Sequence, residues 1–435
     1  MEPSVIGYIG VGVLIALVTL GMPIAFASAL VGIAGITVLK SWNVALALSG
    51  FLPHGVTAHY SLSVIPLFIV MGYFAYFAEL TGDVFKSARN WVGHFPGGLA
   101  LATTFGCAGF AACTGASLAS AAVMGKVAIP EMRKYGYDDR LATGSVAAGG
   151  TFAVLIPPSI PLVLFGIITD QSIALLLIAG IIPGILTAIL YGLLIYGRVR
   201  INPSLAPPLP AVPWKDRISS LKKIWGVLII FILIIGGIYS GAFTPTEAGG
   251  AGATFAFFLA LGMGRLDWAK LKESLLDTGR VAVMIFAIVV GILIFVRFLA
   301  LTGLPAAIAE AIVNAPVHRS IILLGILALY VVLGMFLELI GMMLLTLPIV
   351  FPATVALGFD PIWFGIIVVK MCEMCLVTPP VGLNVYTVFS VAPDVRLEDI
   401  FRGILPFLMV DLFTVVLFIA FPQIITFLPY TMLQR

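Results

Sequence analysis

Two pairs of adjacent prolines, Pro157-Pro158 and Pro379-Pro380, are the residues of this sequence best placed to create an ion-binding site. Both pairs lie inside apolar stretches that would otherwise be helical. Proline lacks a backbone donor and clashes with the carbonyl of the preceding turn, so each pair opens its helix and frees carbonyl oxygens. Such carbonyls can replace the hydration shell of a sodium ion. The N-terminus of the half-helix that follows carries partial positive charge, which favours an anion.

Two further segments could approach these breaks. The segment Gly109–Ser117 (GFAACTGAS) is rich in small residues and offers the hydroxyls of Thr114 and Ser117. The segment Gly334–Gly341 carries Glu338, and an ionisable group at membrane depth is a functional candidate. A helix cap is the alternative interpretation of Glu338, with equal weight.

The remaining charged groups of the apolar segments have structural interpretations as well. Arg297 could bind a substrate carboxylate, or its long side chain could extend to the membrane surface, which we favour. Lys370 and Glu373 lie three residues apart on one helix face, so we expect them to neutralise each other. The segment 244–247 (TPTE) has the form of a capping box with proline at the first helical position.

Composition defines the class of protein that must hold these groups. Of 435 residues, 61% are hydrophobic and 10% charged, whereas soluble proteins carry about 25% charged residues. The apolar stretches run to about 20 residues, as in a bundle of membrane helices rather than a barrel. A net charge of +3 does not indicate a nucleic-acid partner. The four cysteines do not form a disulfide framework, and we interpret Cys372 and Cys375 as small apolar filler.

The apolar stretches predict ten crossings and two helical hairpins. The crossings are expected at about 5–20, 22–39, 63–80, 141–168, 172–197, 225–241, 245–262, 280–301, 361–391 and 403–429. The hairpins are expected at about 98–128 and 319–350, each with a break in its middle, and both would be re-entrant, with tips buried in protein. Segments 40–62, 82–96 and 303–318 are predicted to lie at the membrane surface.

The basic residues predict how the chain is oriented. A proline-rich and basic linker, 198–224, separates the two halves of the sequence. With this linker in the cytoplasm, 18 of the 23 Lys and Arg residues fall on the cytoplasmic side, as the positive-inside rule requires. Both termini are then periplasmic. The acidic start of the chain argues against a cleavable signal peptide.

The two halves repeat each other at an offset of 222 residues. Pro130, Gly136 and Asp138 align with Pro352, Gly358 and Asp360, and the two proline pairs align without a gap. Each half has five crossings, and an odd number places the second half in the opposite orientation. An inverted repeat with broken helices is the architecture of many secondary transporters.

Three motifs carry a resemblance to a known family. GGTFAVLIPPSIPL, FTPTEAG and LVTPPVGLNVY resemble the large membrane subunit of tripartite ATP-independent periplasmic (TRAP) transporters, the DctM family, over essentially the whole chain. The resemblance implies a sodium-coupled importer of organic acids in the bacterial inner membrane, working as an elevator. It also implies two partners, a small four-helix membrane subunit and a periplasmic substrate-binding protein. We expect the small subunit to be a separate chain.

The resemblance also implies site residues. The first sodium site would use main-chain and hydroxyl oxygens of Ala111, Thr114, Ala153, Ile156 and Pro158. The second would use Gly334, Cys375, Thr378 and Val381. Substrate would be bound near Ser117, Ser159 and Asn384, and the charge of Glu338 and Arg297 adds these two residues as substrate-binding candidates. The family commonly has glycine where this chain has Ala153 and Cys375.

The predicted fold is an all-α integral membrane protein, an inverted-repeat elevator-type transporter with two re-entrant hairpins and two helices interrupted by Pro-Pro. Its predicted parts are scaffold helices and arm of repeat 1 (1–96), hairpin 1 and broken helix (97–170), last helix of repeat 1 (171–197), linker (198–224), scaffold helices and arm of repeat 2 (225–318), hairpin 2 and broken helix (319–392) and last helix of repeat 2 (393–435).

Other classes of function fit the sequence less well. An intramembrane hydrolase using Ser117 would need a histidine base, yet all four histidines fall in loop or surface segments. The stronger alternatives are an ion channel with two re-entrant loops and a carrier that does not need sodium. A pure scaffold would leave the broken helices without a purpose. Flux that saturates and requires a sodium gradient separates the predicted carrier from these rivals.

Overall fold

The computed structural model describes residues 2–433, and within this range the chain is built of helices without β-strands. The first half contains α1 (Pro3–Thr19), α2 (Ile24–Leu39), α3 (Trp42–Thr57), η1 (Tyr60–Ser63), α4 (Val64–Phe77), α5 (Leu80–Val92), α6 (Gly98–Thr114), α7 (Ser117–Lys134), α8 (Asp139–Gly150), η2 (Thr151–Val154), α9 (Ile160–Thr169), α10 (Ile173–Ala179) and α11 (Ile181–Ile201). The all-helical class that the sequence predicts is confirmed.

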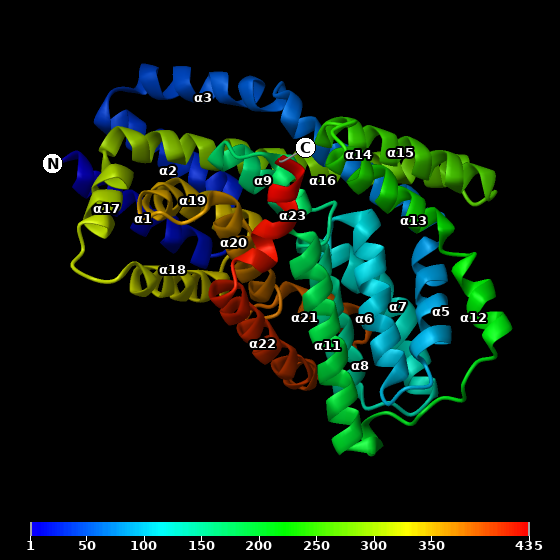
Figure 1. Cartoon of the computed structure of the whole chain (residues 1–435). Coiled ribbons are helices and arrows are strands. Elements are labelled where there is room, and N and C mark those ends of the chain that lie inside the picture. Colours follow the sequence, from blue (N-terminus) through cyan, green and yellow to red (C-terminus); the bar gives the residue numbers. More distant parts are fainter. Residues whose placement is uncertain (1, 434–435) are drawn as a thin grey trace.

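The second half begins after the linker, which itself contains η3 (Pro203–Leu205) and α12 (Trp214–Leu221). It contains α13 (Trp225–Phe231), the π-helical turn η4 (Ile232–Gly236), α14 (Gly237–Tyr239), α15 (Pro245–Gly262), α16 (Trp268–Thr302), α17 (Leu304–Val313), α18 (Arg319–Gly334), α19 (Leu339–Ala356), α20 (Pro361–Cys375), α21 (Leu383–Val391), α22 (Leu397–Ala420) and α23 (Gln423–Leu433). In Figure 1, α16 runs along the upper side of the molecule, from α17 toward α15.

The internal repeat of the sequence is visible in the helix starts. Asp138 caps α8 and Asp360 caps α20, each accepting hydrogen bonds from backbone N–H groups of its helix. The residues two positions earlier, Gly136 and Gly358, both have left-handed backbone angles, with φ of 73° and 77°. Glycine adopts such angles without the steric cost of a Cβ atom. The two broken helices therefore begin in the same way.

Helices α1, α2, α3 and α16 pack around a second, smaller apolar core at one end of the molecule. Its buried residues include Leu14, Ala27 and Phe295. Gly291 of α16 lies against the backbone of α2, where a Cβ atom would overlap the carbonyl of Ala25. Helix α3 buries only a few side chains, among them Ala45 and Leu52. The remaining helices share the larger core, which holds both broken helices.

Three predicted segments differ in the structure. The predicted last span, 403–429, is two helices, α22 and α23, because the helix ends at Ala420 before Pro422. Helix α16 starts at Trp268, well before the predicted residue 280. Among residues 2–433, five helices are long and apolar enough to span a membrane by themselves, or six if a bent pair is one span. Several of the ten predicted crossings are shorter helices or are divided by a break.

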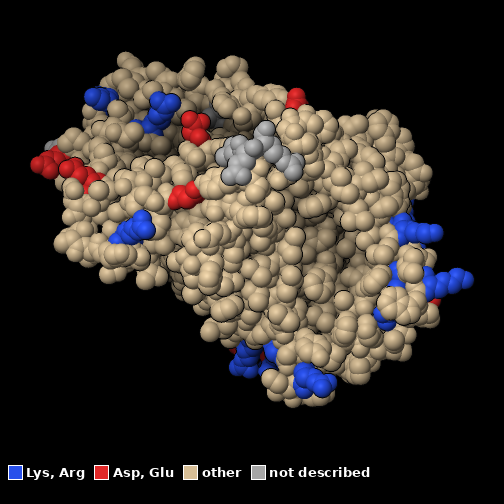
Figure 2. Space-filling model, viewed as in Figure 1, with Lys and Arg blue, Asp and Glu red and all other residues tan. Residues whose placement is uncertain are grey.

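On the face shown in Figure 2, charged side chains lie mainly toward the ends of the molecule. Figure 2 shows Lys and Arg gathered along the lower and right edges, over the end of α11 and over α12, with a smaller mixed group at the upper left. The broad surface between them is almost free of charge. This distribution suits a protein whose middle is surrounded by lipid.

Candidate functional site

The first proline pair separates α8 from α9. Helix α8 continues into the tight turn η2, the chain then passes through Pro157-Pro158, and α9 begins after Ser159. The peptide bond between the two prolines is cis, as is that between Pro379 and Pro380. The Ser159 hydroxyl caps α9 by accepting from the Leu162 N–H at 3.3 Å and donates to the Val154 carbonyl. The opened helix predicted from the prolines is confirmed.

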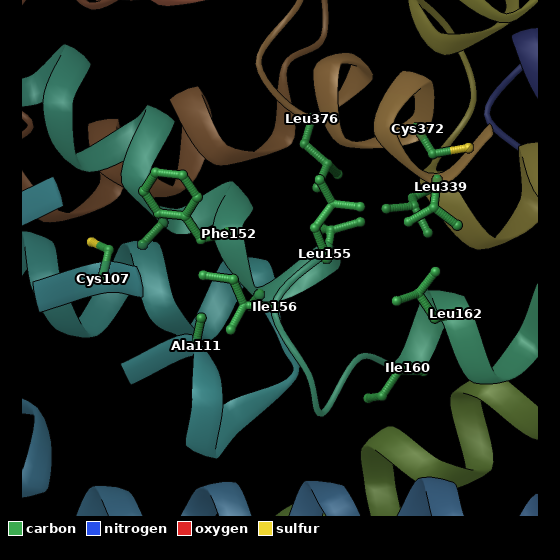
Figure 3. Close-up of a cluster of buried hydrophobic side chains, with 14 of the residues drawn as sticks. Cys107, Ala111, Phe152, Leu155, Ile156, Ile160, Leu162, Leu339, Cys372 and Leu376 are labelled. Atoms are coloured by element: carbon green, nitrogen blue, oxygen red, sulfur yellow. The ribbon is translucent and has the colours of Figure 1, made fainter. Parts of the chain in front are cut away.

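The tip of the first hairpin meets this break. Helices α6 and α7 are joined by Gly115 and Ala116, and Gly115 has a left-handed φ of 59°. A Cβ atom on Gly115 would lie 2.7 Å from the Pro158 carbonyl oxygen. Only glycine therefore allows the tip to come this close to the break. Figure 3 shows Ile156 of the break beside Ala111 of α6.

The tip of the second hairpin meets the second break at the side chain of Cys375. The tip of hairpin 2 follows Gly334, and a Cβ atom there would overlap the Cys375 sulfur. The Cys375 thiol donates to the Met371 carbonyl at 3.1 Å. The Asn384 N–H donates to the Leu376 carbonyl at 2.9 Å across the break. The structure thus brings both predicted sets of sodium-binding residues to a hairpin tip and a helix break, while Thr378 and Val381 remain partly exposed.

A cavity of about 370 Å³ lies where the two tips and the two breaks come together. Its lining combines residues of both hairpin tips, both broken helices, α4 and α16. The lining residues that carry polar side chains are Tyr73, Tyr76, Thr114, Ser117 and Glu338. Figure 3 shows Leu155 and Leu376 from the two breaks close to Leu339 of hairpin 2. Four helices, α7, α9, α19 and α21, have their first turns at this cavity.

Two of the predicted substrate residues contact each other. The Asn384 amide donates to the Ser117 hydroxyl at 2.9 Å and to the Ala147 carbonyl at 3.2 Å. Asn384 is fully buried and Ser117 nearly so. This contact ties the tip of hairpin 1 to the half-helix α21 from the other half of the chain.

The other three predicted substrate residues have different surroundings. Glu338 caps α19, accepting from the Gly341 N–H at 3.1 Å, as one of its two interpretations predicts, and it also lines the cavity. Ser159 is buried within the first break and does not line the cavity. Arg297 is exposed on α16, twelve residues beyond the cavity-lining Ile285, and the structure does not bring it to the site.

A buried charged network lies behind the second break. The Lys370 ammonium donates to Glu373 Oε1 at 3.1 Å, as predicted, and also to Asp411 Oδ1 at 2.7 Å. The Tyr191 hydroxyl donates to Asp411 Oδ2 at 2.7 Å. All four side chains are fully buried. Asp411 and Tyr191 were missed by the sequence reasoning, although a carboxylate inside the predicted last span was a usable signal.

Comparison with known proteins identifies the family. Residues 11–424 match the family described as "Tripartite ATP-independent periplasmic transporter, DctM component". The chain belongs to the DctM family. It is therefore the large permease component of a TRAP transporter, a multi-pass membrane protein that transports its substrate and is not an enzyme.

Individual relatives align with this chain over most of its length and most of their own. The C4-dicarboxylate TRAP transporter large permease protein DctM of Pseudomonas aeruginosa is 35% identical over 85% of this chain and 86% of its own. The sialic acid TRAP transporter large permease protein SiaM of Vibrio cholerae is 32% identical over 99% of this chain and 98% of its own. The YdaH transporter of Alcanivorax borkumensis has a similar fold, with a TM-score of 0.57 and 17% identity over 88% and 90% of the two chains.

Proposed function

We propose that this DctM-family permease imports an organic acid together with sodium ions, by movement of both hairpins and both broken helices against the remaining helices. The observation that carries the proposal is the meeting of two hairpin tips and two helix breaks around one cavity. Each break supplies backbone carbonyls, the oxygen ligands that sodium prefers. Relatives named for C4-dicarboxylates and for sialic acid support an organic acid as the substrate class.

The substrate's carboxylate would meet helix N-termini in the cavity. No lysine or arginine is among the cavity-lining residues, and Glu338 is the single charged one. The first turns of α7, α9, α19 and α21 supply the partial positive charge of helix N-termini instead, although one N–H group in each of α9, α19 and α21 is already bonded. Bound sodium ions at the two breaks would add positive charge next to the same cavity. Substrate and sodium would therefore favour each other's binding.

The moving part would be separated from a fixed scaffold. The smaller core around α1, α2, α3 and α16 holds none of the residues of the two breaks, and Leu345 is the buried residue through which hairpin 2 packs against it. A small four-helix membrane subunit would pack on the scaffold, and a periplasmic binding protein would deliver the substrate. Both partners are proposed from the family, whose description names a tripartite periplasmic transporter.

Uptake into proteoliposomes tests the proposed function. The vesicles hold this chain with its small membrane partner, the binding protein is added outside, and labelled organic acids are supplied with and without an inward sodium gradient. We expect accumulation that saturates and that requires both the gradient and the binding protein. Uptake that does not depend on sodium would overturn the coupling, and flux that does not saturate would favour the channel.

A further inference from the structure

A hydrogen bond joins the two broken helices at the residues just before their breaks. The Thr151 hydroxyl lies 2.9 Å from Glu373 Oε1. Thr151 is the first residue of η2, just before the first break, and Glu373 is in the last turn of α20, just before the second. The two residues are separated by 222 positions, which is the offset of the internal repeat. Equivalent positions in the two halves are thus in direct contact.

This bond has little freedom to be replaced. Both side chains are fully buried, and within the described part of the chain Glu373 Oε2 has no hydrogen-bond partner. Lys370 donates to Glu373 Oε1, and the Thr151 hydroxyl shares its single proton between Glu373 Oε1 and the Ala148 carbonyl, which lies 2.7 Å away. Lys370 is held in place by Asp411 of α22, which Tyr191 of α11 holds in turn. Loss of the Thr151 hydroxyl would leave Glu373 with Lys370 alone.

The position of the bond relates it to both proposed sodium sites. Thr151 is two residues before Ala153 in the first set, and Glu373 is two residues before Cys375 in the second. A sodium ion bound at one break would fix the carbonyls there and, with them, the backbone that carries Thr151 or Glu373. A buried hydrogen bond weakens when either partner shifts, since its geometry is narrow. Fixing the backbone at one break therefore stabilises the ordered backbone conformation at the other break.

We propose that the Thr151–Glu373 hydrogen bond couples the two sodium sites, so that an ion at one break raises the affinity of the other. The proposal rests on the proposed function, because it needs two sodium ions. Coupling of this kind is reciprocal, and each site raises the affinity of the other by the same factor. The bond would act as a positioning contact and would not touch the ions.

The experiment compares three variants of the complex with its small subunit. Thr151→Val removes the hydroxyl at almost constant volume, and Thr151→Ser restores it. Thr187→Val is the matched control, because Thr187 is equally buried but bonds only within its own helix, to the Pro183 carbonyl at 2.9 Å. The initial rate of uptake is measured against sodium concentration, and the sodium dependence of the melting temperature is measured in parallel.

We expect a sigmoidal sodium dependence in the unsubstituted protein, in Thr151→Ser and in Thr187→Val. In Thr151→Val the Hill coefficient falls but stays above one, because uptake still requires both ions, and the second ion binds about five-fold more weakly, the factor that loss of one hydrogen bond implies. If Thr151→Val does not fold, Thr151→Ala is used, which removes the hydroxyl without a branched side chain. A Hill coefficient unchanged by loss of the hydroxyl would overturn the proposal while leaving sodium-coupled uptake intact. Uptake that does not depend on sodium in the unsubstituted protein would instead overturn the proposed function.

Discussion

At the scale of single residues, the ammonium of Lys370 is held on two sides inside the protein. It is fully buried and bonds two carboxylates, Glu373 and Asp411. Charges taken out of water are tolerated when they are paired and hydrogen-bonded, and become costly when one partner is removed. The network therefore has little tolerance for the loss of any one member.

Lys370→Met should be strongly destabilising for this reason. The substitution leaves two buried carboxylates without their cation, and we expect a loss of about 3–5 kcal/mol in the free energy of unfolding. The measurement is the melting temperature of the purified protein in detergent. Arg280→Met is the control, because Arg280 pairs with Asp277 at the surface, where such a pair contributes about 0–1 kcal/mol. Equal shifts in the two variants would contradict the assignment.

At the scale of elements, close packing of the hairpin tips on the breaks depends on glycine. Gly115 approaches the Pro158 carbonyl, and Gly334 approaches the Cys375 side chain. The two contacts differ in kind, since the first involves backbone and the second a side chain that can be changed. This difference makes the second contact open to a test by compensation.

Gly334→Ala should displace the tip of hairpin 2, because the added methyl group would overlap the Cys375 sulfur. We expect a large loss of uptake and weaker sodium dependence, measured in proteoliposomes. Adding Cys375→Gly to the same protein removes the obstacle and should restore much of the activity. Gly325→Ala on the same helix faces open space and should have little effect. Failure of the second substitution to restore uptake would speak against this contact.

A second group of contacts holds α7 to the loop before α22. Arg133 of α7 bonds Asp139 and, at 2.7 Å, Asp394 in that loop. The hydrogen bond from Arg133 lowers the pKa of Asp394 below its ordinary value. A carboxyl group with a lowered pKa stabilises the fold above its unfolded pKa, and this contribution is lost as the pH falls through its folded pKa.

Asp394→Asn should therefore lower the stability of the fold only at pH values above the acidic range. Near neutral pH we expect a slightly lower melting temperature than in the unsubstituted protein, since the pair is exposed. The difference should shrink as the pH falls below the ordinary aspartate value of about 4. A difference that persists or grows on acidification would contradict the role of the Asp394 charge.

At the scale of the whole molecule, sodium should stabilise the folded state. A ligand that binds only the folded protein raises stability with its concentration, by about 2.7 kcal/mol for each site at a hundred times the dissociation constant. We expect a higher melting temperature in sodium chloride than in potassium chloride of equal ionic strength. Equal melting temperatures in the two salts would contradict the two proposed sodium sites.

The class of the protein, its internal repeat and its two helix breaks follow from composition and local sequence alone. The apolar composition requires membrane helices. The missing N–H and the steric clash of proline require a helix break at each proline pair, whatever the rest of the fold. The capping box at Thr244 and Glu247 and the cap at Asp138 are local, so nearby residues determine them. The prediction of one continuous last span was wrong because the apolar composition continues through Pro422, whereas the helix ends at Ala420.

Contacts between residues distant in the sequence depend on the packing of the folded chain. Sequence spacing placed Lys370 beside Glu373, but the pairing of Lys370 with Asp411 and of Ser117 with Asn384 depends on how helices from opposite halves pack. The folded structure likewise places Ser159 inside the first break and Arg297 away from the cavity. Local patterns fix where a helix begins and opens, because those interactions span a few residues. Contacts across 222 or 267 residues follow from packing of the whole chain, which no local pattern encodes.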